Sequence, residues 1–156
     1  MIRSWFVLAS VWLVLVLFLG SAYFAAQETG RFVLPALKLL MPGAPFAQLH
    51  GVHLVLRKLA HLTEYAVLAL LWFKAVHGAG GRTPRSAAWV ALSICLLCAF
   101  ADEVHQSTLP SRQGSARDVL IDGFGAIAML TLERSRQTAR DRQGRLGQAV
   151  AAESAD

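Results

Sequence analysis

An unbroken apolar run opens this chain: WFVLASVWLVLVLFLGSAYFAA, from Trp5 to Ala26, contains no charged side chain. As an α-helix, a run of roughly 22 residues is about 33 Å long, close to the thickness of a bilayer's hydrocarbon core. A secretory signal peptide is the alternative, because Arg3 precedes the run and two alanines end it. The run is longer than a signal-peptide core, however, and Tyr23 and Phe24 spoil a small-x-small cleavage site. We therefore expect a retained transmembrane helix.

The composition favours a membrane protein over a soluble one. Hydrophobic residues make up 55% of the 156 residues and charged residues only 16%, whereas about a quarter of a globular domain is charged. The net charge of +5 is compatible with nucleic-acid binding. The basic residues lie mainly in connecting segments, though, where a topology signal would place them. We expect a membrane lipid as partner and no nucleic acid.

Further apolar segments follow the first, and we expect transmembrane spans at about the following residues: 5–26, 52–76, 86–101 and 118–132. Residues 27–51 contain three prolines, so we interpret them as a connecting segment. Within them, the short amphipathic piece ALKLLM suits a helix in the membrane interface.

The last expected span is short and rich in Gly and Ala. It either needs Asp118 to complete its length or packs tightly against other helices through Gly123 and Gly125. Beyond it the chain is polar and Arg-rich without apolar periodicity, and we expect a frayed helix or disorder. The predicted fold is all-α. It is an integral membrane four-helix bundle with a short interfacial helix in residues 1–132, followed by a flexible cytoplasmic tail in 133–156.

The basic residues predict the orientation of these four spans. Nine fall on the side of the two termini: Arg3, Lys74, Arg82, Arg85, Arg134, Arg136, Arg140, Arg142 and Arg145. Six fall on the other side: Arg31, Lys38, Arg57, Lys58, Arg112 and Arg117. By the positive-inside rule, both termini should lie in the cytoplasm and the protein in the cell (cytoplasmic) membrane.

Ionisable side chains gather at the outer ends of the last three spans. On the second, Glu64 lies about 9 Å deeper than Lys58 along one helical stripe, which holds Arg57, Lys58, His61, Glu64 and Tyr65. On the third, Asp102, His105 and Gln106 share a face, with Glu103 about 100° away. The fourth begins with Arg117, Asp118 and Asp122. An unpaired carboxylate in hydrocarbon is costly, so we expect the acids to pair with these basic residues: Arg57, Lys58, Arg112 and Arg117.

Four motifs follow one another in these segments. They are K-x-x-H-x-x-x-Y-x-x-L from Lys58, D-E-x-x-Q from Asp102, P-x-R-x-x-S-x-x-D from Pro110 and D-x-x-G from Asp122. In this order they resemble the VanZ-like family of small membrane proteins, named after a protein associated with low-level resistance to the glycopeptide teicoplanin. The resemblance implies a multi-pass membrane domain with a cell-envelope role related to antibiotic resistance. It implies these ligand-binding positions: Lys58, His61, Tyr65, Asp102, Glu103, Gln106, Arg112, Ser115, Asp118 and Asp122. At the last of them the family pattern leads us to expect Asn.

Three functions suit this set of side chains. The groups could form a structural network that ties helix ends together. They could bind an anionic lipid or a lipid-linked phosphate headgroup, to which arginine donates forked hydrogen bonds. They could also form an enzyme acting on a phosphoryl or acyl group, in which Arg112 and Lys58 stabilise an oxyanion. The acid and base candidates of that enzyme are His61 or Glu64, partnered by Asp102 or Glu103. We favour the second function.

The sequence predicts neither a metal nor an organic cofactor. A metal would have to take its ligands from the outer histidines and acids: His61, His105, Asp102, Glu103, Asp118 and Asp122. No H-E-x-x-H, P-loop or G-x-S-x-G motif occurs. We interpret Cys95 and Cys98 as small apolar side chains, and His50 and His53 as surface or interfacial residues.

The four-span topology makes a direct prediction. Reporter fusions after Gly80 and Gln148 should report the cytoplasm, and fusions after Gly43 and Gly114 the outside. An outside signal from the fusion after Gln148 would overturn this topology.

Overall fold

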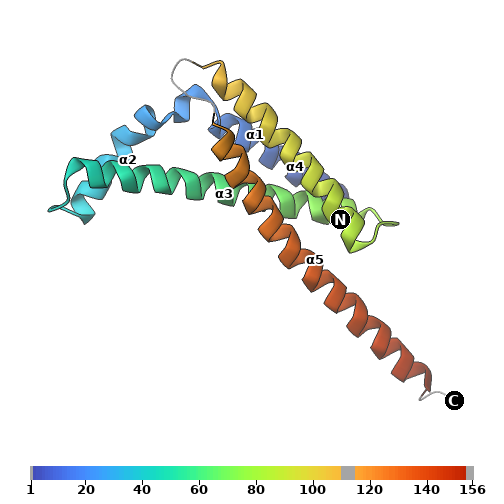
Figure 1. Cartoon of the computed structure of the whole chain (residues 1–156). Helices are drawn as coiled ribbons and strands as arrows, with labels where there is room; N and C mark the ends of the chain where they lie inside the picture. Colours follow the sequence, from blue (N-terminus) through green and yellow to red (C-terminus); the bar gives the residue numbers. More distant parts are fainter. Residues whose placement is uncertain (1, 110–114, 154–156) are drawn as a thin grey trace.

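The computed structural model describes residues 2–109 and 115–153 (Figure 1). Its elements are α1 (Ile2–Leu19), the 3-10 turn η1 (Ala22–Phe24), α2 (Ala26–Leu40), α3 (Phe46–Gly78), α4 (Pro84–Ser107) and α5 (Ala116–Glu153). No strand occurs among the described residues, so the predicted all-α class is confirmed.

Two of these helices, α3 and α4, are each long and apolar enough to cross a membrane. The pair of α1 and α2 would make a third span, although it is bent by 65°. Within the described ranges α5 does not meet the same criterion, because Asp118 and Asp122 lie near its start and the charged segment from Glu133 follows closely. The expected four-helix bundle is therefore not confirmed. The structure supports two apolar spans, or three if the bent pair of α1 and α2 forms one span.

The first expected span differs from the observed helices. α1 ends at Leu19, and the chain turns through Gly20 into η1 and α2 instead of continuing as a helix to residue 26. Most of the expected connecting segment 27–51 is helical, because α2 continues through Pro35 and α3 starts at Phe46. α2 packs on the start of α3 through the buried side chains Leu37, Ala44 and Leu49.

Contacts between the helices determine their relative directions. α1 runs antiparallel to α3, since Phe6 lies against Trp72 and the Trp12 indole donates to the Glu64 carbonyl. α5 runs parallel to α3, because Lys58 pairs with Asp118 and, further along both helices, Lys74 pairs with Glu133. As a result, the end of α1, the outer end of α4 and the start of α5 all meet α3 at the same level.

Small side chains let α4 approach the rest of the core. Every fourth residue along one of its faces is small and buried: Ala87, Ala91, Cys95 and Ala99. Opposite them, Tyr65, Leu68 and Phe73 of α3 are fully buried. Cys95 is thus a small core residue, as expected, and Cys98 is partly buried beside it.

The closest approach is that of α5 to α3 at Gly125. A β-carbon built at Gly125 would lie 2.3 Å from the Leu62 carbonyl oxygen, and one built at Gly123 would lie 3.2 Å from the Leu96 side chain. The expected tight packing through these two glycines is therefore present.

Beyond the bundle, α5 continues as one helix to Glu153 and extends past the other helices (Figure 1). The sequence predicts a frayed helix or disorder in this tail, and the structure has a helix there. Its many Ala, Arg and Gln residues are good helix formers, and an i, i+4 hydrogen bond from Gln137 to Asp141 supports the same structure.

Replacing Gly125 by Ala should force α3 and α5 apart and lower the free energy of unfolding by about 1–3 kcal/mol. Gly144→Ala is the matched control, because nothing lies within 4 Å of a β-carbon there, and Ala in an exposed helix is neutral or stabilising. Thermal unfolding in detergent measures both. Equal melting temperatures for the two variants would contradict the close contact.

Candidate functional site

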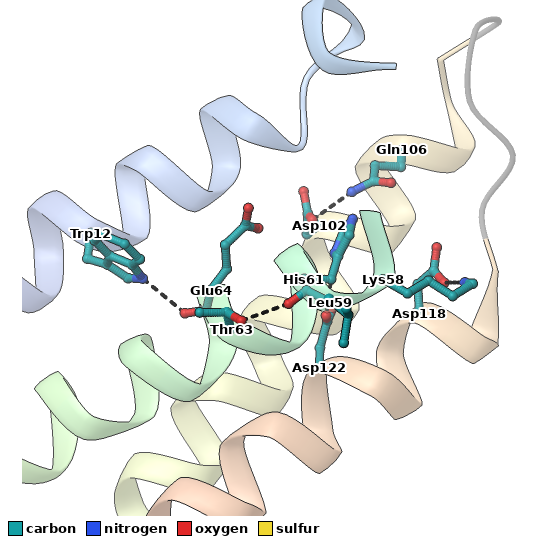
Figure 2. Close-up of polar contacts among 10 residues, drawn as sticks. All are labelled: Trp12, Lys58, Leu59, His61, Thr63, Glu64, Asp102, Gln106, Asp118 and Asp122. Carbon is teal, nitrogen blue, oxygen red and sulfur yellow. Dashed lines mark hydrogen bonds and ion pairs between the residues drawn. The ribbon is translucent and has the colours of Figure 1, made fainter. Parts of the chain in front are cut away.

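A polar cluster lies where the middle of α3 meets the end of α4 and the start of α5 (Figure 2). We define it by the described side chains that the sequence singled out: Lys58, His61, Glu64, Tyr65, Asp102, Glu103, Gln106, Ser115, Asp118 and Asp122. Figure 2 shows residues of all three helices converging here, with the Trp12 indole of α1 reaching the backbone of α3 beside them.

The outermost contact of the cluster joins Lys58 to Asp118. The Lys58 ammonium donates to the Asp118 carboxylate over 2.5 Å, and both side chains are partly exposed to solvent. Because water screens such a pair, it contributes at most about 1 kcal/mol. Its main consequence is that Lys58 and Asp118 neutralise each other.

One turn deeper, His61 faces Asp122. The Nδ1 atom of His61 lies 3.4 Å from a carboxylate oxygen of Asp122, with only 15% and 4% of the two side chains exposed. The contact brings the two groups together without completing a hydrogen bond. A histidine whose Nδ1 faces a carboxylate turns its other ring nitrogen away from that carboxylate, where it can meet a ligand or a proton.

Asp102 forms the α4 side of the cluster. It accepts a hydrogen bond of 2.7 Å from Gln106 one turn later, and both residues are buried. Gly20, in the turn after α1, lies directly against it, since a β-carbon at Gly20 would be 2.3 Å from an Asp102 oxygen. Contrary to the expected shared face, His105 is exposed while Asp102 and Gln106 are buried.

Glu103 connects α4 to the start of α5. Its carboxylate accepts a hydrogen bond from the Ser115 backbone N–H. Arg117 is exposed at the beginning of α5. Arg112, which the sequence proposed as a ligand and a partner of the acids, lies outside the described residues.

Tyr65 is the most deeply buried member of the cluster. Its side chain has no solvent exposure, and its hydroxyl has no hydrogen-bond partner among the described residues. An unsatisfied buried hydroxyl typically costs about 1–3 kcal/mol. Tyr65 therefore packs as a core aromatic residue one turn below His61.

A cavity of about 260 Å³ opens beside the polar cluster, between α3 and the bend that joins α1 to α2. Its lining combines polar and apolar side chains: Leu19, Phe24, Thr29, Val33, His53, Leu56, Arg57, Ala60, His61 and Glu64. His61 and Glu64 are thus the cluster members that face this cavity.

Arg57 and His53 join the cavity to α2. The Arg57 Nη1 atom donates to the Phe24 carbonyl over 2.7 Å and to the Thr29 hydroxyl over 3.3 Å. The Thr29 hydroxyl also lies 3.1 Å from His53, which is only 2% exposed. We had expected Arg57 to pair with an acid and His53 to lie at the surface or interface. The i, i+4 spacing of His53, Arg57 and His61 was the available signal that they share a face.

The sequence of this chain matches the model of a known protein family. The VanZ/LLP1 family model matches residues 5–135. The chain belongs to the VanZ/LLP1 family. Searches of curated proteins and of solved structures found no match. Family membership and the apolar helices together make this a membrane protein.

The positions that the sequence resemblance singled out separate into two groups in the structure. Most of them form the contacts of the polar cluster at the ends of α4 and α5, whereas His61 also faces the cavity. The carboxylate beside His61 belongs to Asp122, where the sequence hypothesis offered Asp102 or Glu103. Among the described residues, no three His, Cys, Asp or Glu side chains are arranged to hold a metal ion.

The buried contact between His61 and Asp122 should show a measurable energetic coupling. In a double-mutant cycle with His61→Gln and Asp122→Asn, we expect a coupling of about 1–2 kcal/mol, measured by unfolding in detergent. The control cycle uses Glu28→Gln and Arg31→Gln, an exposed i, i+3 pair 3.2 Å apart, whose coupling should stay below about 0.5 kcal/mol. Equal couplings would show that the inner contact is no stronger than a surface pair.

Proposed function

We propose that this VanZ/LLP1 protein binds the phosphate headgroup of an anionic lipid in the cavity beside α3, at the outer face of the cell membrane. The proposal includes the topology inferred from the basic residues, with both termini in the cytoplasm. The shared chemistry of its ligands is a phosphate monoester or diester attached to a long apolar chain.

The observation that carries the proposal is the environment of Arg57. This arginine is partly buried and lines the cavity, yet the oxygens that it contacts, at Phe24 and Thr29, are both uncharged. Arg57 is absent from the salt bridges among the described residues, and the carboxylates of Asp118 and Glu64 attract it through longer-range electrostatics. Both contacts use Nη1, so the guanidinium keeps further donors for an anion.

The neighbouring charges support the same assignment. Lys58 is paired with Asp118, and Asp122 faces His61. These contacts offset opposite charges within the cluster. The cavity itself is lined by Arg57, His61 and one carboxylate, Glu64, so Arg57 is the permanently charged basic group that faces it. Arginine is well suited to phosphate, because its planar fork matches two oxygens at once.

Apolar surface around the cavity suits the chain of a lipid. Leu19, Val33 and Leu56 line its walls. On the adjoining bend, Tyr23 is 79% exposed and Phe32 80% exposed, which fits a segment lying in the membrane interface. A lipid could therefore place its headgroup at Arg57 and its chain along exposed apolar surface.

A cell-envelope role follows from the same site. A protein that holds a lipid-linked phosphate at the outer face would act where the lipid-linked precursors of the cell wall are present. The glycopeptide-resistance role suggested by the family resemblance is part of this proposal, since such drugs act on those precursors.

Native mass spectrometry of the full chain tests the proposal with three probes: a polyprenyl phosphate, phosphatidylglycerol and phosphatidylcholine. We expect Arg57→Gln to weaken binding of the two anionic probes about tenfold or more, because a charge-assisted contact is lost. Arg31→Gln is the control, since Arg31 is exposed and lies outside the cavity. The ratio of the two anionic probes identifies the lipid class.

Ala60→Trp keeps every charge but fills the cavity, and it should weaken the same binding. The proposal is wrong if both Arg57→Gln and Ala60→Trp bind the anionic probes as wild type does, whatever their melting temperatures.

A further inference from the structure

A second groove lies at the opposite end of the bundle, between the start of α4 and the middle of α5. Its volume is about 140 Å³, and its lining residues are Arg85, Ala88, Trp89, Leu92, Ile127, Leu130, Thr131 and Arg134. None of them belongs to the polar cluster or to the cavity at Arg57.

The lining residues form two matching helical stripes. On each helix they occur at positions i, i+3, i+4 and i+7, starting at Arg85 on α4 and at Ile127 on α5. The two helices run in opposite directions, so Arg85 lies level with Arg134, and Leu92 lies level with Ile127. The groove is therefore basic at one end and apolar about 10 Å further along.

Acidic side chains do not neutralise the basic end. Neither Arg85 nor Arg134 forms a salt bridge with a residue that the structure describes. The nearest acid in sequence, Glu133, is almost buried and pairs with Lys74 on α3. Two arginines thus face outward at the mouth of an apolar groove.

We infer that this groove binds an anionic phospholipid of the inner leaflet, with the phosphate between Arg85 and Arg134 and an acyl chain running toward Leu92 and Ile127. Trp89 is 61% exposed between these ends, at the level where tryptophan stabilises a helix in the membrane interface. Basic residues on the cytoplasmic side of a membrane are attracted to the anionic lipid headgroups of that leaflet.

The same charges argue against a second copy of the chain as the occupant. In a symmetric dimer the groove would meet its own counterpart. Four arginines would then lie close together without an acid to offset them. An anionic lipid removes this repulsion and also covers the apolar wall.

Native mass spectrometry of the full chain with phosphatidylglycerol and phosphatidylcholine of equal chain length tests the inference. The measurement is made in the Arg57→Gln background, which removes the proposed outer site. There the chain should still prefer phosphatidylglycerol about tenfold or more, and adding Arg85→Gln/Arg134→Gln should abolish that preference. Arg140→Gln/Arg145→Gln removes the same charge from α5 outside the groove and should keep it. Trp89→Ala should weaken binding of both lipids.

Three results would overturn the inference. The first is an equal loss of preference in the control double variant. The second is a preference that Arg57→Gln alone abolishes, which would assign the lipid to the outer cavity and leave the proposed function standing. The third is a dimer that Ala88→Trp converts to a monomer without changing lipid preference, because the groove would then hold a second copy. Conversely, if Arg57→Gln and Ala60→Trp bind the anionic probes as wild type does while Arg85→Gln/Arg134→Gln loses the preference, only the proposed function is wrong.

Discussion

The close contact between α3 and α5 at Gly125 is the constraint on which the candidate site depends. The α5 backbone lies so near the Leu62 carbonyl that a side chain as small as a methyl group would collide. This approach brings Lys58 within reach of Asp118 and His61 within reach of Asp122. A wider separation would leave Asp118 and Asp122 without these basic neighbours, which is costly for a buried acid in a low dielectric.

The pairing of opposite charges in the polar cluster depends on that contact. Short side chains on α5 meet longer ones on α3, so the acids are neutralised inside the bundle while Arg57 turns toward α2. The kink after Leu19 is needed for the same arrangement. It brings Gly20 against Asp102 and carries Phe24 and Thr29 to Arg57. The cavity therefore exists because α1 does not continue as one straight helix.

The arginines of the two candidate lipid sites have different surroundings. Beside the polar cluster Arg57 is held by uncharged oxygens in a cavity, and toward the opposite end Arg85 and Arg134 flank an open groove between two helices. Both arrangements place a guanidinium beside apolar surface, which is the combination that an amphiphilic anion requires. In a membrane protein of this size, lipid contacts at both faces would also help to position the helices relative to the bilayer.

The sequence by itself determined the helical class, the membrane setting, the family and the polar side chains that gather where α3 meets the end of α4 and the start of α5. These depend on hydropathy and helical spacing, which are local properties. It also anticipated the glycine contact of α5. Only the tertiary structure decided that α1 ends at Leu19, that Asp122 is the acid beside His61, and that His53 and Arg57 line a cavity with α2. Each of these depends on the distance between helices far apart in the chain, and no local pattern of residues contains that distance.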